Sequence, residues 1–158
     1  MDDDVPDDVC EIYERVAEEM QQRRYDGSPQ SEPVRIVNLA CDHVLVNNGG
    51  FDGFVGNGYD LGSFLAALVQ LGITEAEPLI ASIDTSIPGF AAMPYRELRG
   101  RIHDHQRGSV GFIALNDYYR EVSPRNLPGI CRMLAKHPDD VALSRDDVAI
   151  LAEYLGKA

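Results

Sequence analysis

Residues 61–72 have the sequence LGSFLAALVQLG, and this stretch decides the fold class. Its large apolar side chains recur at three- and four-residue intervals, which places them on one face of an α-helix. Gly72 follows, and glycine tolerates the left-handed conformation that is common just past a helix end. Because no segment of the chain shows the sustained period-two alternation of a β-sheet, we expect an all-α protein.

The same helical period extends outward in both directions. We expect helices over residues 6–24, 32–47, 61–71, 74–86, 94–107, from 112, 124–137 and 144–155. Thr74 with Glu77 and Ser144 with Asp147 have the spacing of helix-capping pairs. Together these segments predict one compact bundle of roughly seven helices over residues 1–158, with residues 1–5 disordered.

The segment Asn48-Gly49-Gly50 is expected to end the second helix, because glycine readily leaves the helical conformation. Residues 51–60 then contain Gly53, Gly56 and Gly58 beside aromatic side chains, and we expect a compact irregular turn there. The expected structural residues of this turn are Asn48, Gly49, Gly50, Phe51, Phe54 and Asn57.

The amino-acid composition restricts the kinds of partner that the protein is expected to bind. The 158 residues include 26 acidic and 14 basic side chains, a formal net charge of −12. This charge disfavours direct binding to nucleic acid or to an anionic membrane and favours a basic partner. No apolar run approaches the ~18–20 residues of a membrane span, and the acidic N-terminus is unlike a signal peptide. We therefore expect a cytoplasmic protein.

Motifs for catalysis are weak. The stretch Gly53-Phe-Val-Gly56-Asn-Gly58 lacks the order of a nucleotide-binding loop, and residues 108–111 fall one position short of a nucleophile elbow. His103 and His105 are two residues apart and point away from each other on a helix. Cys10, Cys41 and Cys131 have no paired spacing, and His43 has the setting of a core or boundary residue. We therefore predict no catalytic residue, metal or cofactor.

Charge is concentrated near the N-terminus, since residues 1–60 hold 14 acids and 4 bases. In the first expected helix Asp7, Glu11, Glu14 and Glu18 lie within about 40° of one line. Asp8 and Glu19 lie beside this stripe, and the apolar residues point the other way. The predicted partner-binding residues are therefore Asp7, Asp8, Glu11, Glu14, Glu18 and Glu19.

Two interpretations of this acidic face stay open. It can serve only solubility and helix capping, or it can be a recognition surface. Neighbours at these helix spacings lie about 5–6 Å apart, which is close to the spacing of successive phosphates on a nucleic-acid strand. A basic protein that binds phosphates could dock on such a face instead.

A resemblance bears on this choice. It is carried by Asn48-Gly49-Gly50-Phe51-x-x-Phe54-x-x-Asn57, by Leu71-Gly72 and by Phe112-x-x-Leu115-Asn116-Asp117-Tyr118-Tyr119. Over residues 33–140 the sequence resembles the family of small bacterial proteins built on the DNA-mimic-protein C-terminal domain. This resemblance implies an all-α fold, a possible homodimer, and an acidic surface that occupies the DNA-binding face of a transcriptional regulator.

The leading hypothesis is therefore a non-enzymatic DNA mimic that binds a basic DNA-binding protein. One alternative is an immunity or antitoxin-type inhibitor of a basic nuclease. The other is a small hydrolase or metal enzyme that uses His103, Asp104 or His105 with the turn at residues 48–57.

Overall fold

The apolar stretch at residues 61–72 forms the central helix α4, Leu61–Gln70. Asp60 caps its start by accepting hydrogen bonds from the Ser63 N–H at 3.1 Å and the Ser63 hydroxyl at 2.8 Å. Gly72, with φ of +84°, ends it and lets the Ile73 N–H donate to the Leu68 carbonyl. The side chains of Leu61, Phe64, Leu65 and Leu68 are fully buried, as the helical period predicts.

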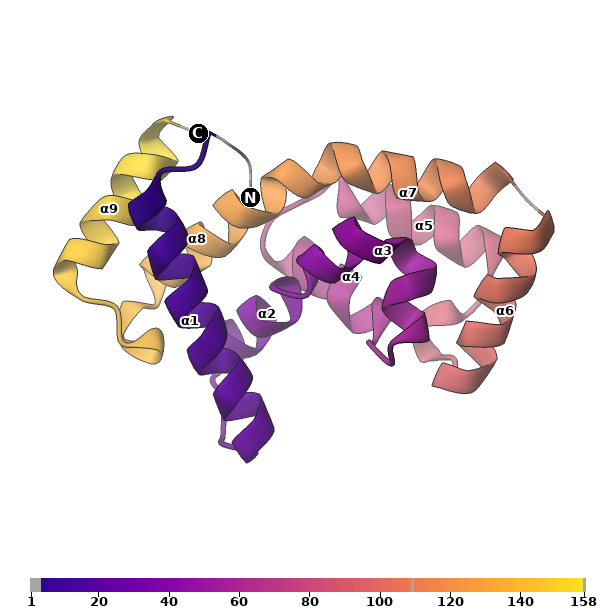
Figure 1. Cartoon of the computed structure of the whole chain (residues 1–158), viewed down its shortest axis with the longest axis horizontal. Helices are drawn as coiled ribbons and strands as arrows, with labels where there is room; N and C mark the ends of the chain where they lie inside the picture. Colours follow the sequence, from indigo (N-terminus) through magenta and orange to yellow (C-terminus); the bar gives the residue numbers. More distant parts are fainter. Residues whose placement is uncertain (1–3, 109, 158) are drawn as a thin grey trace.

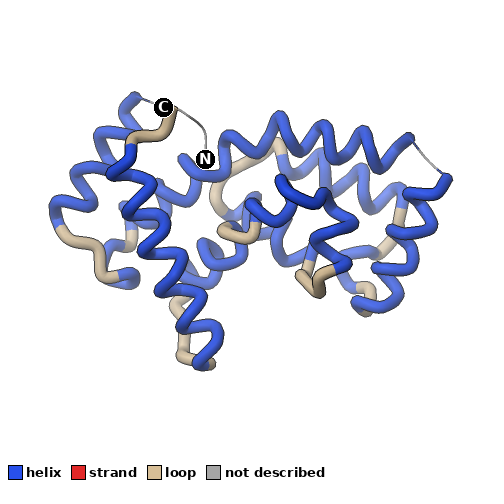
Figure 2. Tube along the Cα trace, viewed as in Figure 1, coloured by secondary structure: helices blue, strands red, loops and turns tan. Residues whose placement is uncertain are grey.

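The computed structural model describes residues 4–108 and 110–157, with the side chains of residues 105–114 left out. The described residues form helices joined by short loops and contain no strand (Figures 1 and 2). Besides α4, the α-helices are α1 Asp7–Asp26, α2 Glu32–Ala40, α3 His43–Gly56, α5 Ala76–Ser86, α6 Tyr95–Gly108, α7 Val110–Val122, α8 Asn126–Lys136 and α9 Arg145–Lys157. The prediction of an all-α fold is confirmed.

The helices form an elongated arrangement with α4 near its middle (Figure 1). Helix α4 packs against α2, α3 and α5, while α2 also packs against α8. At one end, α1 and α8 both contact α9; at the other end, α6 contacts α3 and α7. One cluster of buried apolar side chains includes residues from each of these helices, so both ends share a continuous core.

Three short 3₁₀ helices join these elements: η1 Phe90–Ala92, η2 Ser123–Arg125 and η3 Pro138–Val141. The α-helices are slightly more numerous than the roughly seven expected. One reason is that the segment expected as a single helix over residues 32–47 is divided between α2 and α3. The division falls at Cys41 and Asp42, where Asp42 pairs with Arg24 of α1 at 3.5 Å.

The irregular turn expected over residues 51–60 is wrong for its first half. Gly50 does interrupt the helix, with φ of +68° and ψ of −177°, but the chain resumes a helical course through Gly56. Phe51 and Phe54 drive this return, because both side chains are buried in the core. Gly53 does not end the helix, since burial of these aromatic side chains outweighs its low helix propensity, and the helix ends at Gly56.

The two predicted capping pairs have different outcomes. Ser144 and Asp147 form the pair: the Ser144 N–H donates to Asp147, and the Asp147 N–H donates to the Ser144 hydroxyl. Thr74 does not cap α5, because that helix begins at Ala76 and Glu75 occupies its cap position. The predicted disorder at residues 1–5 falls largely on residues 1–3, which lie outside the described residues. Ser109 also lies outside them.

Candidate functional site

Helix α1 presents the predicted acidic stripe on its outer face. Val9, Ile12, Val16 and Met20 are each at most 3% exposed and attach the helix to the core. Asp7, Glu11, Glu14 and Glu18 are exposed on the opposite side. The helix follows Pro6, carries acids in its first turn and Arg23 and Arg24 in its last, and ends at the left-handed Gly27. The charges in the first and last turns agree with the helix dipole. The stripe therefore lies on a regular helix.

None of these four carboxylates forms an ion pair within the described part of the chain. The stripe therefore carries negative charge that no described side chain of this protein neutralises. Like charges at i and i+4 destabilise a helix by about 0.2–0.5 kcal/mol per pair, so Asp7 with Glu11 and Glu14 with Glu18 have a small folding cost.

Asp8 and Glu19, the two predicted flanking residues, are engaged within the protein. The Asp8 carboxylate accepts a hydrogen bond from the Val9 N–H at 2.9 Å. Glu19 pairs with Arg23, and Arg23 also donates to the Asp140 carbonyl at 3.1 Å. The six predicted residues thus divide into an outward stripe of four and a flank of two whose carboxylates have partners within α1.

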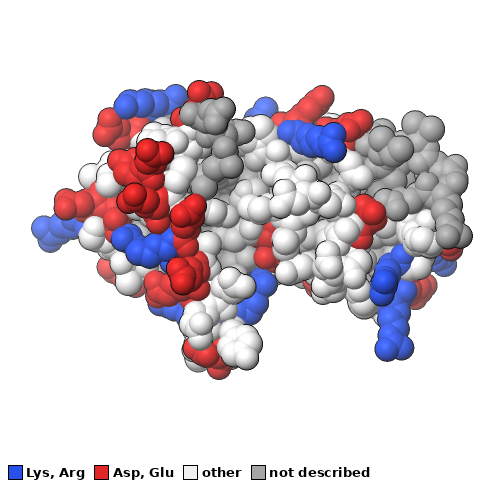
Figure 3. Space-filling view, in the orientation of Figure 1, with Lys and Arg blue, Asp and Glu red and all other residues white. Residues whose placement is uncertain are grey.

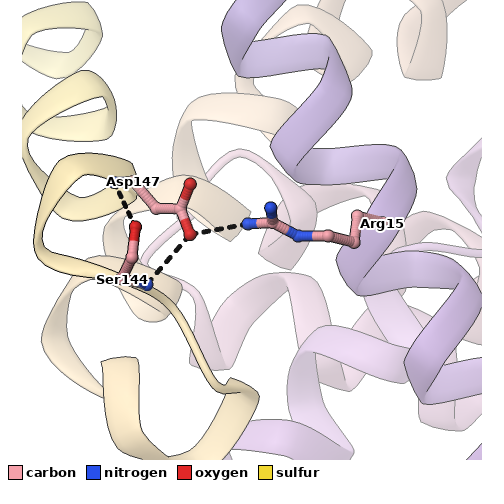
Figure 4. A network of polar contacts seen from close by, with 3 residues as sticks. All are labelled: Arg15, Ser144 and Asp147. Carbon is pink, nitrogen blue, oxygen red and sulfur yellow. Dashed lines mark hydrogen bonds and ion pairs between the residues drawn. The ribbon is translucent and has the colours of Figure 1, made fainter.

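A contact that the sequence did not indicate joins α1 to the start of α9 (Figure 4). The Arg15 guanidinium lies 2.6 Å from the Asp147 carboxylate, which also accepts the Ser144 N–H at 2.9 Å. Burial raises the pKa of Asp147, but the hydrogen bonds from Ser144 and the charge of Arg15 outweigh it, so the pKa is lowered. The only local signal was the spacing of Ser144 and Asp147, which does not reveal Arg15.

The charged side chains are unevenly distributed over the visible face of the molecule. Acidic side chains gather over α1 and α9, with some basic side chains among them, and further basic side chains project near α6 at the other end (Figure 3). At the acidic end, Asp146 is exposed beside the paired Asp147. Helices α1 and α9 also contact each other, and the Asp8 charge contributes, after the larger effect of Glu153, to a raised pKa of Lys157.

The glycine-containing segment at residues 48–57 is hydrogen-bonded to α7 near its centre. The Phe51 N–H, freed by the break at Gly50, donates to the Asn116 side-chain oxygen of α7 at 3.0 Å. A β-carbon at Gly50 would lie 3.1 Å from the Asn116 side-chain nitrogen. Glycine is therefore required at position 50 both for its positive φ and for this close approach. Near the end of the segment, the Asn57 amide donates to the Gly53 carbonyl.

The thiols and His43 have the environments of structural residues. Burial raises the pKa of Cys41 and of Cys131 to about 12, so both thiols stay protonated near neutral pH. Cys10 also has a raised pKa, first from burial and then from the Asp7 charge. Burial lowers the pKa of His43, whose Nδ1 lies 3.1 Å from the Ala40 carbonyl oxygen.

The remaining candidates for chemistry are only partly within the described structure. His103 is exposed and lines the same cleft as Asp52 of α3, whereas the side chains of His105 and Phe112 lie outside the description. Among the residues that were described, no group of three or more histidine, cysteine or acidic side chains could hold a metal ion. Within the same residues, no helix is long and apolar enough to cross a membrane.

No protein-family model matches the chain, and comparisons with curated proteins and with solved structures found no match. The resemblance to the DNA-mimic family therefore stays a prediction from the sequence motifs.

Proposed function

We propose that this protein is a non-enzymatic, cytoplasmic DNA mimic that occupies the DNA-binding surface of a basic protein such as a transcriptional regulator. The observation that carries the proposal is the outward stripe of α1, where Asp7, Glu11, Glu14 and Glu18 are exposed and form no ion pair with a described side chain. Lysine and arginine side chains that bind phosphates can pair with these carboxylates at similar spacing.

The contrast between the stripe and its flank supports this proposal over a role in solubility alone. Charges that serve the fold of α1 have partners within the chain, as Glu19 has Arg23 and Asp147 has Arg15. The stripe has no such partner among the described side chains, although its like charges oppose helix formation. A basic partner would offset this repulsion, so the complex gains energy that the free protein lacks.

The test compares three forms of the protein as baits for proteins in a lysate of the source cell. The first is the natural sequence, and the second has the substitutions E11K, E14K and E18K on the stripe. The matched control has E77K, D104K and E121K, which are exposed positions away from α1. Both variants change the formal net charge from −12 to −6, so the comparison separates the position of the charges from their number.

The proposal predicts a basic DNA-binding protein that is retained by the natural sequence and by the control but not by the stripe variant. Salt should elute it, because screening weakens exposed ion pairs, and its own operator DNA should compete for it. Equal retention by the stripe variant, or no competition by operator DNA, would overturn the proposal. Circular dichroism of both variants checks that the helices remain.

The same stripe fits an immunity or antitoxin-type inhibitor of a basic nuclease. In that case the protein eluted by salt has nuclease activity, and adding the natural sequence, but not the stripe variant, inhibits it. A possible homodimer is a separate expectation from the family resemblance, and sedimentation of the isolated protein tests it.

A further inference from the structure

A cleft of about 480 Å³ lies between the second half of α3 and the first half of α6. Val55 and Ile102, both buried, form its apolar part, and Asp52 contributes a half-buried carboxylate. The two helices are tied together at one side, where the Tyr95 hydroxyl donates to the Gly56 carbonyl at 3.0 Å. The volume is within the range of about 300–1,000 Å³ that is typical of small-molecule sites.

Two glycines keep this cleft open. Gly56 of α3 and Gly100 of α6 both line it, and a β-carbon added at either position would meet no atom within 4 Å. These glycines therefore do not permit a tight approach of the two helices, as glycines at helix crossings often do. They remove the side chains that would otherwise fill the space between α3 and α6.

The α6 side of the cleft is basic. Arg96, Arg99 and His103 all line it, and their spacing of three and four residues places them on one face of the helix. Neither arginine forms an ion pair with a described side chain, whereas the neighbouring Arg101 pairs with Glu97. Arg96 and Arg99 are both exposed, so their guanidinium groups are accessible to a ligand in the cleft.

We propose that this cleft binds a small phosphorylated compound, with Arg96 and Arg99 holding the phosphate group. Two guanidinium groups match the charge of a phosphate dianion, and each offers the planar donor pair that phosphate oxygens accept. His103 provides a further hydrogen-bonding group beside them. Val55 and Ile102 close the floor of the cleft with almost no exposed surface, and Asp52 accepts a hydrogen bond from a hydroxyl or amino group on the compound.

The probes for this site are inorganic phosphate, adenosine monophosphate and adenosine, each titrated into the full chain by calorimetry and followed by nuclear magnetic resonance. Both phosphate-bearing probes should bind saturably and shift the arginine side-chain signals, and the nucleotide should bind more tightly than phosphate. Adenosine should bind at least about tenfold more weakly than the nucleotide, because it lacks the charged group.

Three variants assign the binding to the cleft. R96A/R99A should weaken both phosphate-bearing probes by at least about tenfold, whereas the control R132A/R145A, which removes two exposed arginines elsewhere, should not. G100L leaves the arginines in place and fills the cleft, so it should weaken the nucleotide by a similar factor. Leucine favours a helix more than glycine does, so loss of folding is not expected for this variant.

The proposal is overturned if neither phosphate-bearing probe binds saturably up to about 10 mM, or if R96A/R99A binds them as the natural sequence does. Binding of a single-stranded oligonucleotide with no binding of the nucleotide would also overturn it. Hydrolysis of the nucleotide by the natural sequence, lost in R96A/R99A, would support the cleft while contradicting a non-enzymatic protein.

Discussion

The contact between Arg15 and Asp147 should stabilise the attachment of α1 to α9, and D147A removes it. Asp147 serves two purposes, since it accepts the Ser144 N–H at the start of α9 and pairs with Arg15 of α1. Its side chain is only 13% exposed, whereas that of Arg15 is 57% exposed. The variant therefore loses a largely buried capping group and a partly solvated ion pair.

The expected loss in the free energy of unfolding is about 1–2 kcal/mol. Loss of a helix-capping side chain costs about 0.5–2 kcal/mol. An ion pair with an exposed partner contributes about 0.2–1 kcal/mol, and the exposure of Arg15 favours the lower part of that range. R15A should therefore cost less than D147A, and the double variant should cost less than the sum of the two single variants.

Urea denaturation followed by circular dichroism measures these differences for the natural sequence, R15A, D147A and R15A/D147A. The pH dependence gives a second readout. The pKa of Asp147 is lowered in the folded state, so its stabilising effect is present above the unfolded pKa of about 3.9 and is lost as the pH falls through the folded value. The difference between the natural sequence and D147A should thus shrink below about pH 4.

Two results would refute this reasoning. If D147A unfolds within about 0.3 kcal/mol of the natural sequence near pH 7, neither the cap nor the pair contributes as argued. If the effects of R15A and D147A are strictly additive, the two side chains do not interact in solution.

Three further predictions concern residues inside the protein. G50A should lower the free energy of unfolding by about 1–3 kcal/mol because of its positive φ and the close Asn116 side chain, whereas G49A, which meets no atom, should be neutral or stabilising in the same urea assay. Y119F should cost about 1–3 kcal/mol, because it removes the one hydrogen bond that the described residues give the fully buried Asn126 side chain; adding N126L should restore part of the loss. Cys131, buried and with a pKa of about 12, should resist Ellman's reagent near pH 8 in the native protein and react in concentrated urea.

The fold class could be predicted because apolar periodicity is a local property. The stripe of α4 and the inner face of α1 both lie where three- and four-residue spacing places them. The course of residues 51–56 could not be predicted in this way. There the chain returns to a helix after Gly50 with Phe51 and Phe54 buried in the core, and the Phe51 N–H freed by the break finds an acceptor on Asn116, 65 residues away in sequence. No pattern near Gly50 signals that acceptor.

The candidate sites could likewise be predicted only in part. The outward position of Asp7, Glu11, Glu14 and Glu18 follows from helix geometry alone. The engagement of Glu19 and the pairing of Arg15 with Asp147 depend on how α1, η3 and α9 come together. The cleft between α3 and α6 depends on Gly56 and Gly100, which lie 44 positions apart in sequence and line the same cavity. The sequence around either glycine gives no sign of the other.

The two proposed sites belong to different parts of the contact network, so their tests are independent. Helix α1 packs against α2 and α9, whereas α6 packs against α3 and α7. Screening in physiological salt limits exposed charges to a range of about 8 Å, so charge reversal on α1 should leave nucleotide binding at α6 unchanged. If E11K, E14K and E18K together altered that binding substantially, the two ends would be linked through the core, and neither site could be interpreted from its own side chains alone.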